Sequence, residues 1–316
     1  MWGILKGMLK RALAAILIFV LTTILFGCGS AQPKTIKLGL TPAVDAIPFI
    51  IAQDNGYFKK RGIEVELQVF KSAKDRDTAF LSTDLDGVLC DLIAICIYNN
   101  SGTSVKITGI TDGDFMLIAG ANSGIKSMKD LKGSKKKVAI SEKTVIDFTL
   151  DKLLEKNSLS DNDIAKEMIP SIPTRLEMLR NDKVQLALLP EPYSSLAIKS
   201  GGIKIDSAYN NGIYSNVSAF KQETLNNKSE AVKELNSAYK EALEYIKNTP
   251  VEKYEDKLID FIGYPKDMKG QIMLPEYRDN TLPDNSSIGA AIKWCLDRGI
   301  IKKELKAEEL VYKLFD

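Results

Sequence analysis

The chain has 316 residues with 43 Lys and Arg, 41 Asp and Glu and no His, so its formal net charge at neutral pH is +2. Near neutrality argues against nucleic acid as a partner, because binding to phosphate backbones relies on clustered Lys and Arg. The lack of His excludes a Ser-His-Asp triad and any His-ligated metal site. Since the sequence also lacks GxSxG, Walker A and GxGxxG motifs, we expect no enzyme, no cofactor and no metal.

The N-terminal segment has the pattern of an export signal. Basic residues precede the apolar run "ALAAILIFVLTTILFG", as in the n-region and h-region of a signal peptide. The stretch "LFGC" resembles the lipobox of bacterial lipoproteins, although Phe26 replaces the usual small residue. We predict a signal peptide over 1–27, a lipid on Cys28, a tether over 28–34 and an extracytoplasmic, membrane-anchored protein. The alternatives are a retained anchor helix, or a Cys28 that ends the signal by chance.

The remaining cysteines are Cys90, Cys96 and Cys295. An odd number cannot all pair, and no CxxC or Cys/His metal spacing occurs. We expect all three to be small apolar core residues, with Cys90 also placed near a site.

Strands and helices alternate along the first part of the chain. A strand over 35–42 stops at Pro42, and a helix is predicted within 45–62 with Gly56 near its end. The alternation of "IEVELQVF" predicts a strand over 63–70. This βαβ unit implies a partly parallel sheet. A second helix is expected at 75–83 and a strand at 104–110, with the apolar stretch 86–100 between them.

After residue 120 the α/β pattern begins again, which predicts a second lobe. The expected elements are strands at 137–140, 166–170 and 184–192, helices at 141–159 and 174–182, and long helices at 230–248, 288–300 and 306–315. The chain must cross between lobes near 111–120 and 211–220, and two such crossings form a hinge that closes on a ligand. We assign 35–114 and 215–316 to lobe 1, and 115–214 to lobe 2.

Several stretches resemble, in order, the solute-binding lipoproteins of ATP-driven importers that take up sulfonates, taurine, nitrate or thiamine precursors. "IKLGLTPAVDAIPFIIAQDNGYFKKRGIEVELQVF" is similar to the family's opening, "VQLALLPEPY" to its second cleft-facing turn, and "IKWCLDRGIIKKELKAEELVYKLF" to its last two helices. The resemblance implies an α/β, two-lobed periplasmic-binding-protein fold (type II-like), with two mixed sheets flanked by helices and two hinge crossings.

The same resemblance implies a function. It suggests a substrate-binding lipoprotein of an ABC importer that captures a small polar organic solute (sulfonate, taurine or thiamine-precursor-like) and delivers it to the membrane permease as a monomer. One alternative is a surface lipoprotein that senses a ligand for a membrane receptor. Another is an exported enzyme that uses Asp/Glu pairs.

Ligands of such proteins bind where strands end and helices begin. Thr41 and Asp45 follow the first strand, where Asp45 either faces the ligand or caps the next helix. Ser141 and Thr144 follow the strand at 137–140. Thr144 and Asp147 have capping-box spacing, and the helix start favours an anionic group, so these hydroxyls either contact the ligand or only cap the helix.

The third group of candidates is Cys90 and Asp91 together with Glu191, Tyr193 and Tyr214. Carboxylates at two cleft edges favour a ligand with a cationic or amide donor, hence a zwitterion or an aminopyrimidine rather than a bare anion such as nitrate, unless both carboxylates are capped or solvated. The two tyrosines either stack on a flat ligand or cover the surface.

Overall fold

The computed structural model describes residues 2, 34–82, 85–272 and 274–315. Lys34–Asp316 forms one compact unit, separate from residues 1–33. Cys28, the signal peptide and nearly all of the tether therefore lie outside the described residues, and they stay predictions. Within the described part, no helix is both long and apolar enough to span a membrane.

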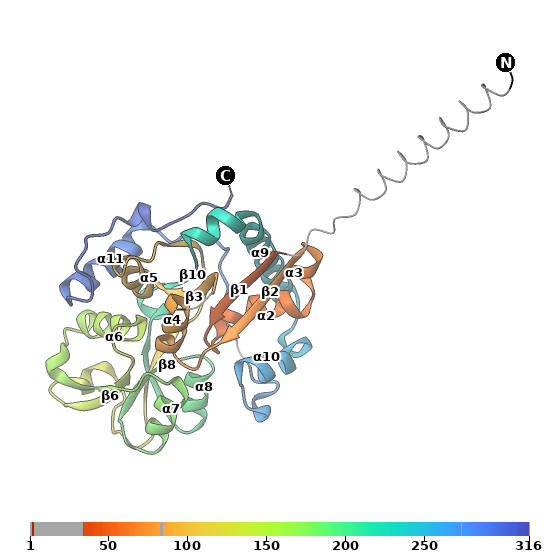
Figure 1. Ribbon diagram of the computed structural model, residues 1–316. Coiled ribbons are helices and arrows are strands. Elements are labelled where there is room, and N and C mark those ends of the chain that lie inside the picture. The colour runs from red at the N-terminus through yellow and green to blue at the C-terminus, as the bar shows by residue number, and fades with distance from the viewer. Residues whose placement is uncertain (1, 3–33, 83–84, 273, 316) are drawn as a thin grey trace. The chain divides into compact units, whose positions relative to one another are not determined.

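The first sheet contains five strands in the order β2, β1, β3, β10, β4 (Figure 1). Their bounds are β1 Lys34–Leu40, β2 Ile63–Val69, β3 Gly87–Asp91, β4 Val105–Ile110 and β10 Asn216–Lys221. β1 runs parallel to β2 and β3, as the βαβ pattern predicts, whereas β10 is antiparallel to β3 and β4.

The second sheet has the order β7, β6, β8, β5, β9. Its strands are β5 Phe115–Ala119, β6 Lys136–Ile140, β7 Ile164–Met168, β8 Leu186–Pro190 and β9 Ile203–Ser207. β6 is parallel to β7 and β8, and β5 is antiparallel to β8 and β9. Two mixed, five-stranded sheets are therefore present, as predicted.

Helices cover both faces of each sheet. The bounds are α2 Ile47–Asp54, α3 Tyr57–Lys60, α4 Ala73–Ser82, α5 Leu92–Asn100, α6 Val145–Lys156, α7 Ile172–Arg180, α8 Tyr193–Lys199, α9 Gln222–Asn248, α10 Glu255–Ile262 and α11 Asn285–Asp297. Neighbouring residues of one strand enter different apolar clusters. Leu89 packs with α2 and α9, while Val88 and Cys90 pack with α5 and α11. Burial on both faces explains why the strand "GVLCD" is apolar nearly throughout.

We call the first sheet with its helices the first lobe, and the second sheet with its helices the second lobe. The chain passes between the sheets through residues 111–114 and again through residues 208–215. The residue boundaries assigned to the lobes stay predictions. Cys90, Cys96 and Cys295 are buried, unpaired core residues, as expected.

The helix expected within 45–62 is confirmed as α2, which is preceded by a 3-10 turn, η1 (Val44–Ala46), and ends just before the left-handed backbone of Gly56 (φ 70°), as predicted; the short α3 follows Gly56. One helix prediction is wrong. The helix expected over 306–315 is a single 3-10 turn, η7 (Ala307–Glu309). Beyond η7, the backbone of Leu310 and Tyr312 bonds to Ile107 at the edge of β4 instead of to itself.

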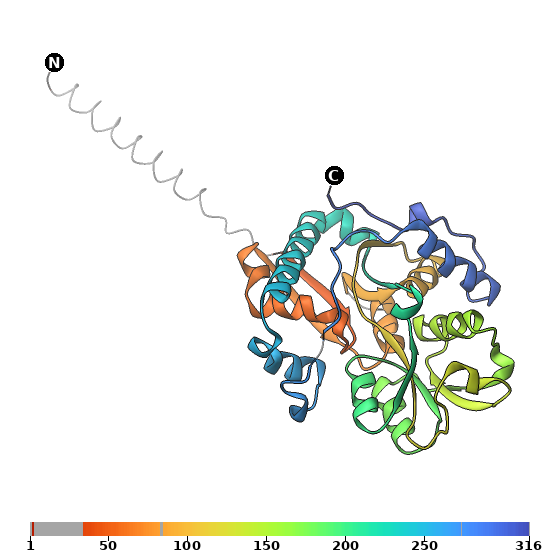
Figure 2. The ribbon, with the colours of Figure 1, turned by 180° about the vertical axis from the view of Figure 1, so that it is seen from behind.

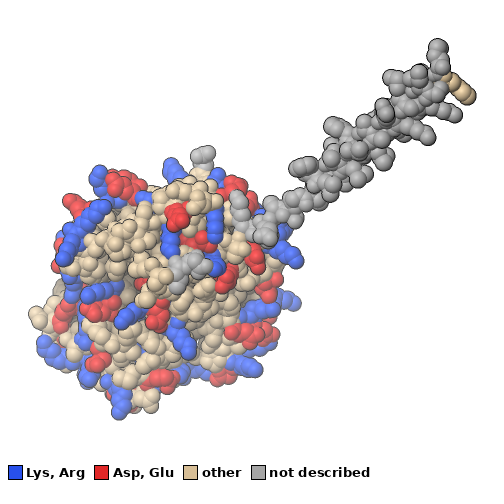
Figure 3. All heavy atoms as spheres, viewed as in Figure 1, with Lys and Arg blue, Asp and Glu red and all other residues tan. Residues whose placement is uncertain are grey.

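The C-terminal residues then lie beside α9 in both views of the chain (Figures 1 and 2), where Lys240 Nζ is 4.5 Å from the centre of the Phe315 ring. On the face drawn in Figure 3, basic and acidic side chains are interspersed. This face therefore presents no single-sign patch of the kind that binds nucleic acid.

Candidate functional site

A small cleft lies between the two lobes, with about 50 Å³ of free space and walls from both sheets. Its lining comes from the loops and helices that follow the carboxyl ends of β1, β3, β6 and β7, which is where α/β sheets bind ligands. Six of the predicted contact residues line it, namely Thr41, Asp45, Cys90, Asp91, Ser141 and Thr144. Their contact with a ligand stays a prediction.

Asp45 enters the cleft from η1 in the first lobe. It is the N-cap of neither η1 nor α2, whose N-cap residues are Ala43 and Ala46, so the capping alternative is wrong. Asp45 Oδ2 accepts a hydrogen bond from Asn216 Nδ2 at 3.2 Å, and the residue is 6% exposed. Burial raises the pKa of the Asp45 carboxyl to about 6, because desolvation disfavours the charged form.

Asp91 lies at the end of β3 and caps α5. Its Oδ1 accepts hydrogen bonds from the backbone N–H groups of Ile93 and Ala94, both at 3.0 Å. The same side chain lines the cleft, so capping and a place at the site coincide. Burial raises the pKa of the Asp91 carboxyl to about 6.

Ser141 and Thr144 form the opposite wall at the start of α6. Thr144 is the N-cap, as predicted: its Oγ1 accepts a hydrogen bond from Ile146 N at 3.2 Å and donates to the carbonyl of Ser141 at 2.8 Å. The predicted capping box is wrong, because the Asp147 carboxylate bonds to Lys143 N and to Lys166 Nζ instead of to Thr144 N. The start of α6 therefore faces the cleft with one hydroxyl already engaged.

Arg175 is a cleft residue that sequence analysis missed. It lies in α7, it is 1% exposed, and it lines the cleft from the second lobe. Among the residues that the structure describes, Arg175 Nε and Nη1 have no hydrogen-bond partner. Burial alone lowers the pKa of the guanidinium to about 10. Because buried polar groups are nearly always bonded, these two atoms call for an explanation.

Arg76 is a second missed residue, on the first-lobe wall. Its Nη1 donates to the Leu89 carbonyl at 2.8 Å, and its Nε and Nη2 donate to Asp77 Oδ1 at 2.8 and 2.6 Å. Its Nη2 also lies 4.0 Å from Asp91 Oδ2. Unlike Arg175, this guanidinium is already neutralised by a protein carboxylate.

A sequence signal for both arginines existed. Arg175 falls three residues after Ile172 and four before Leu179, within the apolar stripe of α7. Arg76 precedes the buried Phe80 by four residues in α4. A charged residue at the spacing of a buried face marks a position where a partner is required.

The other three predicted residues do not line this cleft. Glu191 is buried, and its carboxylate accepts hydrogen bonds from Ser195 Oγ at 2.9 Å and from Ser195 N at 3.4 Å. Tyr193 begins α8 and packs against the apolar core. The Tyr214 ring lies 4.3 Å from the guanidinium carbon of Arg278. Their role as ligand contacts stays a prediction.

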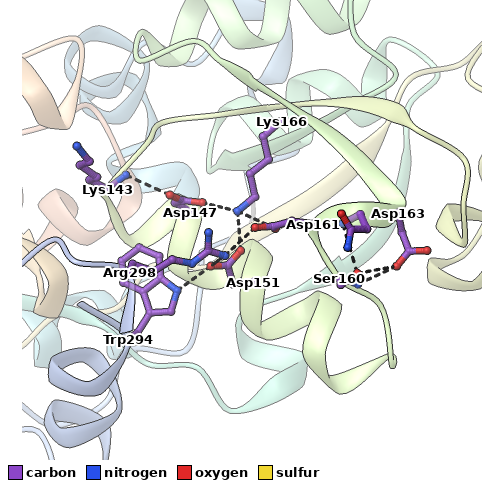
Figure 4. A network of polar contacts seen from close by, with 10 residues as sticks. Lys143, Asp147, Asp151, Ser160, Asp161, Asp163, Lys166, Trp294 and Arg298 are labelled. Atoms are coloured by element: carbon purple, nitrogen blue, oxygen red, sulfur yellow. Dashed lines mark hydrogen bonds and ion pairs between the residues drawn. The ribbon is translucent and has the colours of Figure 1, made fainter. Parts of the chain in front are cut away.

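A network of charged side chains joins the two lobes through α6 (Figure 4). Asp151 in α6 accepts hydrogen bonds from Trp294 Nε1 at 2.7 Å and from Arg298 Nη2 at 2.5 Å, both at the α11 end of the first lobe. Lys166 in β7 reaches Asp151 at 2.6 Å and Asp147 at 2.8 Å within the second lobe. The helix whose start lines the cleft is therefore also tied to the other lobe.

We find no group of three or more His, Cys, Asp and Glu side chains suited to a metal ion within the described part of the chain.

The fold is that of periplasmic binding proteins, as predicted. The chain is similar to the ligand-binding component of an ABC-type import system from Staphylococcus aureus, crystallised with zinc (TM-score 0.74, 14% identity, covering 89% of this chain and 97% of that chain). It is also similar to the alkanesulfonate-binding protein SsuA from Xanthomonas axonopodis pv. citri bound to MOPS (TM-score 0.74, 15% identity, 90% and 100% covered). At these identities the likeness shows the fold.

Among curated proteins, bicarbonate-binding protein CmpA of Synechococcus elongatus is 38% identical over 63 residues, which are 20% of this chain and 14% of that protein. The match thus spans a small part of CmpA. A much longer match, over residues 43–253, is to the family described as NMT1/THI5 like. Because this match takes in more than half of the chain, the protein belongs to the NMT1/THI5 like family.

Proposed function

We propose that the protein is the solute-binding component of an ABC import system and that it binds a small solute with an anionic group between its lobes. The observation that carries the proposal is Arg175, whose buried Nε and Nη1 lack a partner among the described residues and which lines the cleft. A buried guanidinium without a partner is costly. An anionic ligand would supply the missing acceptors through a charge-assisted pair.

Two of the similar proteins are named for anions, one as alkanesulfonate-binding and one as bicarbonate-binding. A third is named as the ligand-binding component of an ABC-type import system, which supports the import role. We therefore place the solute among small polar compounds of the sulfonate, taurine or thiamine-precursor type.

The start of α6 adds to the same end of the cleft. A helix N-terminus stabilises an anion by about 0.3–1 kcal/mol, and up to about 2 kcal/mol when partly buried. Micromolar affinity requires about 8 kcal/mol. Arg175 and the enclosure of the solute between the lobes must therefore supply most of the binding free energy.

The setting of this function follows from the N-terminal segment. A lipid on Cys28 would hold the protein on the outer side of the membrane, where the lobes close on the solute and a monomer delivers it to the permease. As part of an import system, the cleft would hold the solute and release it unchanged.

A ligand screen tests the proposal. The full chain in mild detergent is followed by thermal unfolding with ethanesulfonate, taurine, nitrate, bicarbonate and an aminopyrimidine. A ligand at 100 times its Kd adds about 2.7 kcal/mol, which at about 2–4 °C per kcal/mol raises the Tm by several degrees. We expect at least one anionic compound to do so.

Arg175→Met, which removes the buried guanidinium, should lose this ligand-induced shift. Arg180→Met is its matched control, because Arg180 lies in the same helix but pairs with Glu177 at 3.0 Å near the surface. It should keep the ligand-induced shift. A shift produced only by cationic or uncharged compounds would contradict the proposal.

A further inference from the structure

The wall opposite Arg175 buries carboxylates. Asp45 is 6% exposed and Asp91 is 4% exposed, and both line the same cleft as Arg175. Asp45 comes from η1 and Asp91 from the end of β3, so both belong to the first lobe. Arg175 comes from α7 of the second lobe. The two lobes therefore bring opposite charges to one small space.

The charges on the first wall do not balance. Arg76 is engaged by Asp77 through two of its nitrogens and by the Leu89 carbonyl through the third. Asp91 Oδ2 lies 4.0 Å from Arg76 Nη2, which is too far for a hydrogen bond. Asp45 accepts the Asn216 amide at 3.2 Å and has no ion pair with any described residue. Three carboxylates thus surround one guanidinium.

A simple anion satisfies only one side of this cleft. It would pair with Arg175, but it would also bring a second negative charge toward Asp45 and Asp91, and like charges in a desolvated space repel. A ligand that also carries a protonated amine would give Asp45 and Asp91 a donor. The cleft would therefore favour an anion that carries an amine, which both walls attract, over a simple anion, which the two carboxylates repel.

We propose that the solute is a small zwitterion, with its anionic group on Arg175 and the start of α6 and its protonated amine on Asp45 and Asp91. This inference rests on the proposed function. The free space of about 50 Å³, against about 10–15 Å³ for one water molecule, leaves room for a small solute. Asp45 and Asp91 are then the residues that determine specificity.

Matched ligand pairs test the inference. The full chain in detergent is titrated calorimetrically at pH 7.5 with taurine and ethanesulfonate, and with β-alanine and propionate. Each pair shares an anionic group and differs in the amine. We expect the zwitterion of at least one pair to bind ten-fold or more tightly than its amine-free partner.

Variants of the two aspartates test where the amine of the ligand binds. Asp45→Asn and Asp91→Asn remove the charge and keep the shape, and Asn also serves as an N-cap for α5. Both should abolish the preference for the amine while the amine-free anion binds at least as well as before. Glu142→Gln is the control, because Glu142 follows Ser141 but its side chain is 54% exposed. It should leave the preference unchanged.

The outcomes separate the two proposals. If ethanesulfonate or propionate binds as tightly as its amino partner, or if the Asn variants keep the preference, the inference is overturned and the anion-binding function stands. If none of the four compounds binds to folded protein, the inference is overturned. If, in addition, mass spectrometry of the purified protein recovers no anionic solute, the proposed function is overturned too.

Discussion

At the scale of single residues, we expect Arg175 to strengthen ligand binding and to lower the stability of the ligand-free protein. Its guanidinium is buried without partners for Nε and Nη1 among the described residues. Arg175→Met keeps the length of the side chain and removes the charge. We expect anion affinity to fall more than ten-fold, while the Tm of the ligand-free protein rises by a few degrees because an unpaired buried charge is gone. Calorimetry and thermal unfolding measure the two effects.

Arg180→Met should do neither, since that side chain bonds to Glu177 and Ser200 near the surface. A lower Tm for Arg175→Met without ligand, together with unchanged affinity, would show that the guanidinium stabilises the fold and has no ligand.

Asp45 and Asp91 make the ligand-free protein sensitive to pH. Burial raises the pKa of both carboxyls to about 6, against about 3.9 in an unfolded chain. A raised pKa means that the stabilising contribution is fully present below about pH 4 and is lost as the pH rises through about 6. Arg76 opposes this loss and Asp77 adds to it at Asp91, while the Asn216 amide opposes it at Asp45.

Thermal unfolding of the ligand-free protein and of Asp45→Asn/Asp91→Asn checks this between pH 4 and 7. Asn mimics the protonated carboxyl. As the pH rises from 4 to 7, the free energy of unfolding of the variant should therefore increase relative to that of the natural protein, by about 2–3 kcal/mol per carboxylate. This increase appears as a higher Tm. Other carboxylates also make stability depend on pH, for example Asp284, whose hydrogen bonds hold its pKa at about 2. Because both proteins contain them, their contribution cancels in the difference between the two proteins. A difference that shrinks with rising pH would contradict the assignment.

At the scale of elements, α6 and α11 hold the lobes together beside the site. Arg298 reaches Asp151 and Asp161 across the lobes, and Trp294 Nε1 reaches Asp151. We expect Arg298→Met with Trp294→Phe to raise the rate of ligand dissociation about five-fold, because each partly exposed pair is worth about 0.2–1 kcal/mol. Release of radiolabelled ligand into an excess of unlabelled ligand measures the rate, since Trp294→Phe removes the only Trp beyond Trp2.

Glu155→Gln is the matched control for this network. Glu155 also lies in α6, but it pairs with Lys152 at 2.7 Å within the helix and touches no part of the first lobe through that contact. Glu155→Gln should leave the rate of ligand dissociation unchanged. Equal rates in the natural protein, the double variant and Glu155→Gln would show that the network does not help to keep the lobes closed.

At the scale of the whole molecule, the predicted lipid on Cys28 decides where the protein works. Each buried methylene of an acyl chain contributes about 0.8 kcal/mol to membrane binding. We expect the full chain made in a bacterial host to partition into the detergent phase, and Cys28→Ser to move to the aqueous phase. Phase partitioning with mass spectrometry of the N-terminal peptide measures this. A Cys28→Ser protein that stays in the membrane would favour the retained anchor helix.

Local pattern predicted most of the fold because the sheets impose it. Alternation in "IEVELQVF" predicts β2, and the apolar run around Leu188 predicts the strand β8, which is buried along its whole length. The βαβ order predicts parallel pairing. The pattern failed at 306–315, where helical spacing is present but Leu310 and Tyr312 bond to the edge of β4.

The site was predicted only in part. Thr144 could be found because an N-cap follows from sequence position alone. Asp91 could be found as a carboxylate beside Cys90 after the stretch "DLDGVL", but its capping of α5 was not predicted. Arg175 could not be assigned, since its burial and the lack of a hydrogen-bond partner for its Nε and Nη1 among the described residues depend on how α7 packs in the folded chain. Glu191 was placed at a cleft edge, but the turn into α8 directs its carboxylate to Ser195.

The sequence by itself therefore determined the alternation of strands and helices, the family resemblance and the strand ends where a site could form, because these depend on residues close together along the chain. The tertiary structure decided which charges meet. Asp45, Asp91 and Arg175 come from η1, β3 and α7 and reach one cleft only when the two lobes pack together, and the energy of a buried charge depends on its neighbours in space rather than on its neighbours in sequence.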